Sequence, residues 1–183
     1  MTVGAFHACG LRPNGTAECW GSFYSSHNEL NPPEGTFDQV TAGLFHNCGV
    51  RTDGTVACWG ANYSGQSSPP PGTFSQVSSG WFHTCGVRRD GTVACWGLND
   101  FGQSSPRAGV FTQVSAGFDE SCGIMSDETL VCWGAHAHEF PGRFSQVSVG
   151  GLHTCALTRD RTVQCWGQSL YGESELLSGR SLR

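Results

Sequence analysis

The chain has 183 residues, of which 14% are charged and 38% are hydrophobic, and its net charge is −5. This length supports one domain, and the many aromatic residues with little net charge exclude a disordered chain. All ten basic residues are arginines, which excludes lysine Schiff-base chemistry, and the acidic balance argues against nucleic acid as a partner. No stretch approaches the roughly 20 apolar residues of a membrane helix, so membrane insertion is not expected.

Taken in chain order, the cysteines reveal a repeat. Five pairs share a spacing of ten residues, and each second cysteine is followed by Trp-Gly: Cys9/Cys19 with Trp20, Cys48/Cys58 with Trp59, Cys85/Cys95 with Trp96, Cys122/Cys132 with Trp133, and Cys155/Cys165 with Trp166. The pattern predicts a single repeat domain, 1–183, with repeats at about 1–35, 36–72, 73–109, 110–142 and 143–172 and a tail at 173–183.

Two further motifs precede each cysteine pair. Phe-x-Gln-Val opens repeats two to five, beginning at Phe37, Phe74, Phe111 and Phe144. Gly-x-x-His follows in four of the repeats, ending at His7, His46, His83 and His153, while repeat four has Glu120 at this position. Short β-branched and aromatic runs, interrupted by Gly and Pro about every ten residues, predict an all-β chain.

The centre of each repeat is expected to be a β-hairpin. In repeat two, a strand from His46 to Arg51 turns at 52–54 and returns from Thr55, and the glycine that ends the loop favours a type I turn with a bulge. If Arg51 and Thr55 form a hydrogen-bonded pair, Cys48 and Cys58 face each other at a closely spaced, non-hydrogen-bonded pair. The register therefore predicts a local disulfide in every repeat. Repeats four and five carry Glu128 and Arg161 in place of the turn glycine, which predicts strained or altered turns.

The same register places the disulfide and valines on one face of the hairpin and the tryptophan beside small residues on the other. Neither face can be buried alone. We therefore expect the stacking of successive repeats to bury both faces, with each tryptophan packed against a neighbouring repeat. From tryptophan to the next phenylalanine, the links are 17, 15, 15 and 11 residues, and the short link Gly134 to Arg143 is expected to mark a distinct edge.

The order Phe-x-Gln-Val, Gly-x-x-His, Asp-Gly-Thr-Val and Trp-Gly-x-Asn-x-x-Gly-Gln resembles the regulator-of-chromosome-condensation repeat family, most closely at Asn62, Gly65, Gln66, Asn99, Gly102 and Gln103. The short repeats are similar to its compact bacterial branch, which includes a propeller-type β-lactamase inhibitor protein. The resemblance implies a β-propeller of five short blades, each with three or four strands and a hairpin disulfide. The family usually has seven blades. Five blades that close imperfectly, a segment of a larger ring, and completion by neighbouring molecules are therefore all open, with Leu176, Leu177 and Leu182 as a poor substitute for a closing strand.

For the cysteines, five disulfides in an oxidising compartment are weighed against free thiols and against zinc bound by His46, Cys48 and Cys58. We expect an extracellular or periplasmic protein, although Met1 to Gly10 has no signal-peptide pattern. The repeated histidines are expected to make a buried hydrogen bond within each blade. His136, His138 and Glu139 are interpreted as an exposed loop or a metal site. Asn14 and Asn62 lie in glycosylation sequons whose use the sequence leaves open.

The two residues between Gly and His form the candidate binding site. We name this set the apolar ring, and its members are Phe6, Leu44, Phe45, Trp81, Phe82, Phe118 and Leu152. Equivalent positions of a propeller encircle its axis on one face, where such side chains would either bind a partner or fill the channel.

The sequence favours a non-catalytic module without a cofactor, acting by protein interaction or self-association through this face. The alternative is a carbohydrate-binding propeller that uses Asn62 and Asn99. Inhibition of a β-lactamase and guanine-nucleotide exchange are weaker possibilities, implied by the resemblance alone.

Overall fold

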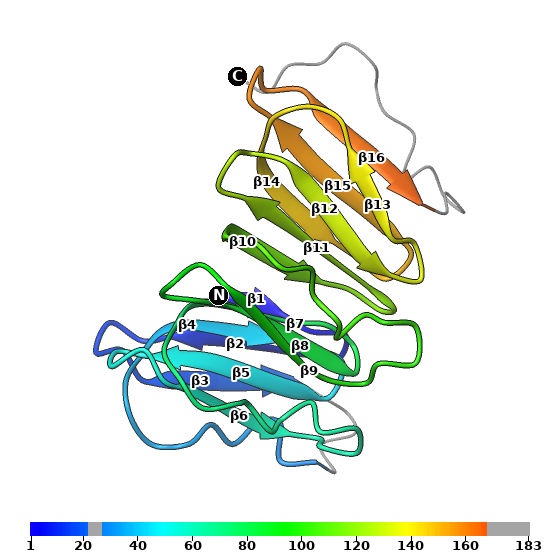
Figure 1. Ribbon diagram of the computed structural model, residues 1–183. Helices are drawn as coiled ribbons and strands as arrows, with labels where there is room; N and C mark the ends of the chain where they lie inside the picture. Colours follow the sequence, from blue (N-terminus) through cyan, green and yellow to red (C-terminus); the bar gives the residue numbers. More distant parts are fainter. Residues whose placement is uncertain (22–26, 168–183) are drawn as a thin grey trace.

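The structure is a computed structural model that describes residues 1–21 and 27–167. Strands form five antiparallel sheets, called blades 1 to 5, which follow one another in chain order (Figure 1). Their strands are β1 (Thr2–Val3), β2 (His7–Leu11) and β3 (Ala17–Gly21); β4 (Phe37–Ala42), β5 (His46–Arg51) and β6 (Val56–Gly60); β7 (Phe74–Ser79), β8 (His83–Arg88) and β9 (Val93–Gly97); β10 (Phe111–Ala116), β11 (Glu120–Met125), β12 (Leu130–Gly134) and β13 (His138–Phe140); and β14 (Phe144–Val149), β15 (His153–Thr158) and β16 (Val163–Gly167). Among the described residues, no helix is long and apolar enough to cross a membrane.

The hairpin register is as predicted. Arg51 N donates to Thr55 O at 2.7 Å, and Cys48 lies opposite Cys58 with their Cα atoms 4.0 Å apart. All ten cysteines pair in this way, so none is a free thiol or a zinc ligand. The five disulfides are Cys9–Cys19, Cys48–Cys58, Cys85–Cys95, Cys122–Cys132 and Cys155–Cys165.

The two cysteines of a disulfide differ in burial. The first cysteine of the pair lies on the middle strand of its blade and is fully buried in blades 1 to 4. The second lies on the following strand, which is the outer edge of a three-stranded blade, and Cys19, Cys95 and Cys165 are only partly buried there, as is Cys58. Stacking therefore buries the disulfide face fully at the middle strand and only partly at these outer strands. Cys132 is the exception, because β13 pairs beside it and it is buried.

The hairpin turns explain the Asp-Gly-Thr sequence. Gly54 has a φ of 89°, in the left-handed region that favours glycine. Asp53 Oδ1 accepts hydrogen bonds from Thr55 Oγ1 at 2.7 Å and Thr55 N at 2.8 Å, and these bonds lower the Asp53 pKa. Glu128 and Arg161 keep the same turn, with φ values of 74° and 65°, so both hold the strained conformation that the sequence predicted.

Blades pack face to face in a single repeating arrangement. The disulfide face of blade 2, with Cys48 and Val50, packs against Phe74, Val77 and Trp96 of blade 3. Equivalent clusters form at the other three junctions. The Gln of Phe-x-Gln-Val joins adjacent inner strands, since Gln39 donates to Val77 O at 3.0 Å and accepts from Val77 N at 2.9 Å.

The two outermost faces depart from this arrangement. Trp20, on the outer face of blade 1, is 47% exposed, so the prediction that every tryptophan packs against a neighbour is wrong there. At the other end, Cys155, Leu157 and Val163 on the disulfide face of blade 5 are only partly buried. Neighbouring inner strands pack in series from β1 through β4, β7 and β10 to β14, and no comparable packing joins β14 back to β1, so the described residues form an open arc. The suggested closing strand, 176–182, lies outside the described residues.

The short link between blades 4 and 5 forms an extra strand. β13 pairs with the outer strand β12 through Leu130, Val131 and Cys132, so blade 4 alone has four strands in the described part of the chain. His138 lies on this strand and its ring contacts Phe140 at 5.0 Å between centroids. The expectation of an exposed loop is therefore wrong for His138, although its side chain is exposed.

Candidate interaction face

The Gly-x-x-His loops connect each inner strand to the hairpin and all lie on one face, which we call the loop face. The glycine is required because the neighbouring blade approaches closely: a Cβ on Gly43 would lie 2.3 Å from Gly80 O. The loops are joined by backbone hydrogen bonds between blades, such as Trp81 N to Gly117 O at 2.9 Å. The rigid backbone of the blades therefore sets the positions of the side chains between Gly and His.

The apolar ring divides into two sets. In blades 2 and 3 the first side chain of the pair faces the central opening, since Leu44 and Trp81 line a cavity of about 320 Å³ there together with Ala5 and Gly151. Phe118, the first residue of the pair in blade 4, does not line it. The second residue does not line this opening, and Phe6 and Leu152 are 50% and 46% exposed. Leu44 is buried, whereas Trp81 is 39% exposed. Leu44 thus points into the opening, Phe6 and Leu152 are exposed to solvent, and Trp81 is both on the wall of the opening and accessible.

Two further residues of the apolar ring, Phe45 and Phe118, make aromatic contacts with Phe6 and Trp81. Phe6 stacks on Phe45 with ring centroids 5.5 Å apart, and Trp81 and Phe118 form an edge-to-face pair with ring centroids 4.7 Å apart. Phe82 is partly buried.

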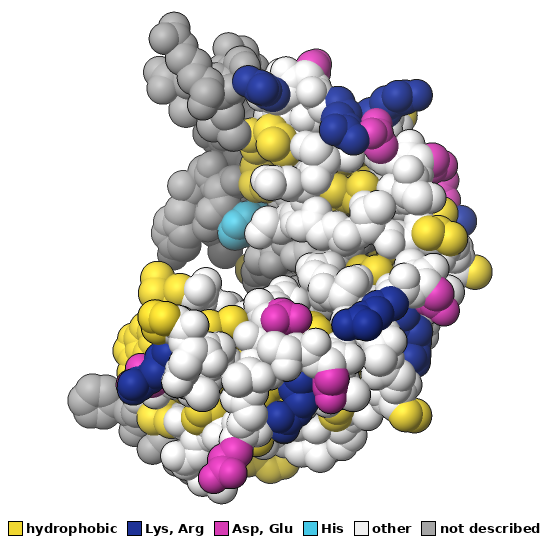
Figure 2. Space-filling view, turned by 90° about the vertical axis from the view of Figure 1, so that its left-hand side faces the viewer, with side chains coloured by type: hydrophobic (Ala, Val, Ile, Leu, Met, Phe, Trp, Pro, Cys, Tyr) yellow, Lys and Arg dark blue, Asp and Glu magenta, His cyan; other side chains and the backbone are white. Residues whose placement is uncertain are grey.

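Two residues outside the apolar ring, His27 and Tyr63, extend these contacts into an aromatic cluster, and the sequence did not single them out. The His27 ring lies 5.4 Å from Phe45 and 5.3 Å from Tyr63, which is 76% exposed. Both residues come from links between blades rather than from the repeated motif, so no repeat pattern marked them. Figure 2 shows hydrophobic side chains gathered beside a hollow in the half of the molecule that holds blades 1 to 3.

Beneath the loops, the repeated histidines connect neighbouring blades. His46 Nε2 lies 2.8 Å from Thr84 Oγ1 of blade 3, and His83 Nε2 lies 2.8 Å from Ser121 Oγ of blade 4. His7 pairs in the same way with Asn47 Oδ1 at 2.7 Å. The prediction of a bond within each blade is therefore wrong: the bond crosses to the next blade. Burial lowers the pKa of His46 to about 3 and that of His83 to about 4.

Blade 4 has a carboxyl group where the other blades have histidine. Glu120 is 7% exposed and accepts a hydrogen bond from Thr154 Oγ1 at 3.0 Å, and burial raises its pKa. Within residues 1–21 and 27–167, three possible metal ligands converge only at Glu120, Cys122 and Cys132, where the cysteines form a disulfide. That group does not include His136, His138 or Glu139.

The asparagines considered for sugar binding make hydrogen bonds within their own loops. Asn62 Oδ1 accepts from Ser67 N at 2.9 Å, and Asn99 Oδ1 accepts from Ser104 N at 2.9 Å. In the sequon at Asn14, Oδ1 accepts from Thr16 N at 3.1 Å.

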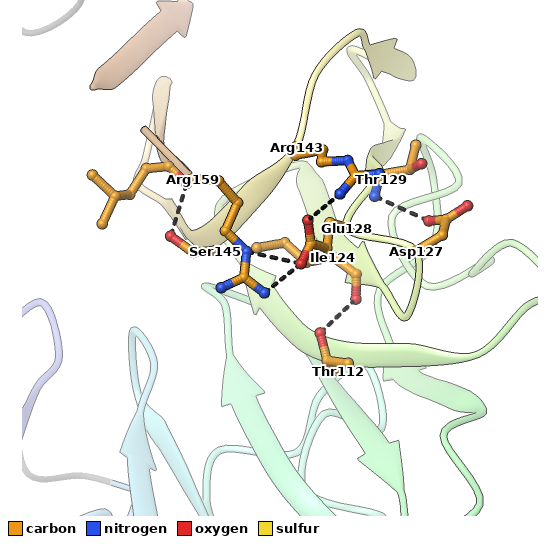
Figure 3. Close-up of polar contacts among 9 residues, drawn as sticks. Thr112, Ile124, Asp127, Glu128, Thr129, Arg143, Ser145 and Arg159 are labelled. Atoms are coloured by element: carbon orange, nitrogen blue, oxygen red, sulfur yellow. Dashed lines mark hydrogen bonds and ion pairs between the residues drawn. The ribbon is translucent and has the colours of Figure 1, made fainter. Parts of the chain in front are cut away.

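The opposite face carries the hairpin turns and is charged. Glu128, at a turn of blade 4, accepts a hydrogen bond from Arg159 Nε at 2.8 Å and also pairs with Arg143 (Figure 3). This ion-pair network joins blades 4 and 5 at the face away from the apolar ring.

Comparison with known proteins identifies the repeat. The model of the regulator of chromosome condensation (RCC1) repeat matches residues 37–66, 74–103 and 144–173. No curated protein matches the sequence.

Several solved structures share this architecture. The ectodomain of the receptor kinase CR4 from Physcomitrella patens is 28% identical, with a TM-score of 0.76, over 91% of this chain and 49% of its own length. The CRINKLY WD40 ectodomain of the Arabidopsis thaliana receptor kinase ACR4 is 27% identical, with a TM-score of 0.73, over 90% of this chain and 61% of its own. Prp20p from Saccharomyces cerevisiae shares the fold, with a TM-score of 0.76 and 17% identity. The match covers 92% of this chain and 57% of Prp20p. The chain thus spans about half to three-fifths of these proteins.

Proposed function

Repeats of the RCC1 family build this chain, and on that premise we propose that it is an extracellular, non-catalytic module that binds a protein partner through its loop face. The observation that carries the proposal is the group of accessible apolar side chains on that face, above all Trp81, Phe6 and Leu152. Aromatic side chains of this kind dominate the energetics of protein interfaces. The rigid loops hold them in place, so little conformational entropy is lost on binding.

The disulfides support the extracellular part of the proposal. Five disulfides and no free cysteine among all ten suit an oxidising compartment. The two plant relatives above 25% identity are both ectodomains of receptor kinases, which is consistent with this location.

A partner isolated by cross-linking in the native source provides the test. We expect Trp81→Ala to weaken binding by about 30-fold or more, because a central aromatic residue of an interface contributes about 2 kcal/mol or more. Val110→Ala is the matched control: Val110 is 50% exposed but lies just before β10, next to the hairpin turn of Gly91 on the opposite face. It should leave the affinity unchanged, as measured by calorimetry with purified components.

Two results would contradict the proposal. Equal loss of affinity in both variants would place the interface elsewhere. Saturable binding of glycans on an array, abolished by Trp81→Ala, would instead support the carbohydrate-binding alternative. Sedimentation of the free chain separates binding to a different protein from self-association.

A further inference from the structure

A small cavity separates blades 4 and 5 just below the loop face. It has a volume of about 130 Å³, and its walls include Glu120, His136, Leu152, His153 and Trp166. Among residues 1–21 and 27–167, two of its buried polar atoms have no hydrogen-bond partner, namely Glu120 Oε1, an acceptor, and Trp166 Nε1, a donor. A buried donor or acceptor that is left unpaired loses its hydrogen bonds to water without replacement, so a ligand that pairs both atoms is favoured.

At the other three junctions a link residue fills the equivalent place. Its main-chain carbonyl accepts a hydrogen bond from the blade tryptophan: Trp59 Nε1 donates to Glu29 O at 3.0 Å, Trp96 Nε1 to Gln66 O at 2.8 Å, and Trp133 Nε1 to Gln103 O at 3.0 Å.

The same carbonyl also accepts from the side chain that follows the histidine position. Thr84 Oγ1 donates to Gln66 O at 3.2 Å, and Ser121 Oγ donates to Gln103 O at 3.1 Å. Gln66 and Gln103 are 1% and 0% exposed. These link residues are therefore integral parts of their junctions.

The link between blades 4 and 5 cannot place a residue in the equivalent position of its junction. It is four residues shorter than the two links before it, and its residues 138–140 are held in β13 at the outer edge of blade 4. Trp166 consequently lacks its carbonyl, and Thr154 donates to Glu120 instead.

The turn that fills the junction between blades 3 and 4, residues 99–105, is held together by its own hydrogen bonds. Asn99 binds Ser104 N and Ser105 Oγ, and Phe101 N donates to Gln103 Oε1 at 2.9 Å. Gln103 Nε2 has no hydrogen-bond partner among the described residues of its own junction. A turn of this kind therefore offers both groups that the cavity lacks, a carbonyl acceptor and an N–H donor.

We propose that the cavity between blades 4 and 5 binds a glutamine-containing turn of a partner polypeptide, whose carbonyl accepts from Trp166 Nε1 and whose N–H donates to Glu120 Oε1. This deepens the proposed function, on which it rests for the existence of a protein partner. Leu152 is 46% exposed and forms a wall of the cavity, so a turn bound here continues onto the loop face.

The probe is an acetylated, amidated heptapeptide with the sequence of residues 99–105, titrated into the full chain. Two-dimensional ¹H–¹⁵N NMR reports the indole N–H of each tryptophan. We expect saturable binding with a shift of the Trp166 resonance, and no binding of the peptide in which glutamine is replaced by alanine.

Variants of the chain test the contacts. Trp166→Phe and Glu120→Ala should each weaken peptide binding about tenfold. Trp96→Phe is the matched control, because the Trp96 donor is already satisfied by Gln66, and it should leave peptide affinity unchanged. Replacing residues 135–143 by a copy of 98–110 supplies the missing turn within the chain and should abolish peptide binding while the Trp59 and Trp96 resonances stay in place.

Absence of any Trp166 shift up to the solubility limit of the peptide would show that the cavity holds only water and would overturn the proposal. Binding that survives in both Trp166→Phe and Glu120→Ala would overturn it as well, and these two variants keep the test decisive if the replacement variant does not fold. Failure of the peptide test with a Trp81-dependent partner would reject the cavity proposal alone.

Discussion

At the scale of single residues, the repeated polar side chains connect blades rather than stabilise a blade internally. The histidines show this most clearly, because His46 and His83 are fully buried and each pairs with a hydroxyl of the next blade. Burial disfavours the charged form of each imidazole, so it lowers the pKa values of both histidines.

The first prediction concerns the acid dependence of stability. An unfolded histidine titrates near pH 6.5, whereas His46 and His83 stay neutral in the folded chain until about pH 3 and 4. The unfolded state therefore binds more protons below pH 6.5, and stability should fall by about 1.4 kcal/mol per pH unit for each histidine down to about pH 4. Glu120 acts in the opposite direction, since burial raises its pKa.

Urea unfolding at pH 7.5, 6, 5 and 4.5 measures this slope. His46→Gln should be less stable at pH 7.5 but show a shallower slope than the parent chain, because the buried neutral imidazole is removed. Identical slopes for the parent chain and His46→Gln would refute the assignment.

The second prediction compares two tryptophans that differ in one hydrogen bond. Trp96 Nε1 donates to Gln66 O at 2.8 Å, while Trp166 Nε1 has no partner in the part of the chain that the structure describes. Trp96→Phe should therefore cost about 1 kcal/mol more in free energy of unfolding than Trp166→Phe. Chemical denaturation of both variants measures the difference, and a larger loss for Trp166→Phe would show that the donor is satisfied in solution.

At the scale of elements, the hairpin keeps the same register in every repeat of this chain. Its turn accepts Glu128 and Arg161 in the left-handed region without changing shape, so the register and the disulfide are retained in blades 4 and 5. Glu128 gains ion pairs with Arg159 and Arg143. The described contacts of Arg161 include only the backbone bond of its turn, from its N–H to Thr158 O at 3.1 Å.

The third prediction follows from this difference. Arg161→Gly should raise the free energy of unfolding by about 1 kcal/mol, because glycine adopts the left-handed conformation without strain. Glu128→Gly should stabilise the chain less, since it also removes the ion pairs. Thermal and urea unfolding of the two variants provide the measurement, and a destabilised Arg161→Gly would contradict the strain argument.

At the scale of the whole molecule, stability comes from junctions between blades. Each junction buries a disulfide face against a tryptophan face, so a blade with one uncovered face contributes less. Trp59 is 7% exposed within such a junction, and Trp20 is 47% exposed at the end of the arc.

The last prediction uses this pair. Trp59→Ala should cost about 3–5 kcal/mol, because it leaves a cavity against the disulfide face of blade 1. Trp20→Ala should cost less than about 1 kcal/mol. The free energies of unfolding in urea measure both, and a comparable loss at Trp20 would show that its face is covered in solution.

Much of this molecule could be read from local sequence. The ten-residue cysteine spacing, the Asp-Gly turns and the alternation along each strand determined the hairpin, its register and all five disulfides, because these features depend on residues close together in the chain. The repeat also indicated that blades pack face to face.

The tertiary structure decided what depends on contacts between blades. Only the packing showed that the histidine bonds cross to the next blade, that Leu44 turns inward while Phe6 stays exposed, and that His27 and Tyr63 join the aromatic cluster. How far the next blade covers each disulfide was decided in the same way, since Cys9 and Cys85 are fully buried while Cys19 and Cys95 are not.

The cavity at Glu120 and Trp166 likewise arises from packing, because a short link leaves a place that Gln66 and Gln103 fill elsewhere. Such features depend on how residues about 37 positions apart meet, and the spacing within one repeat carries no information about that.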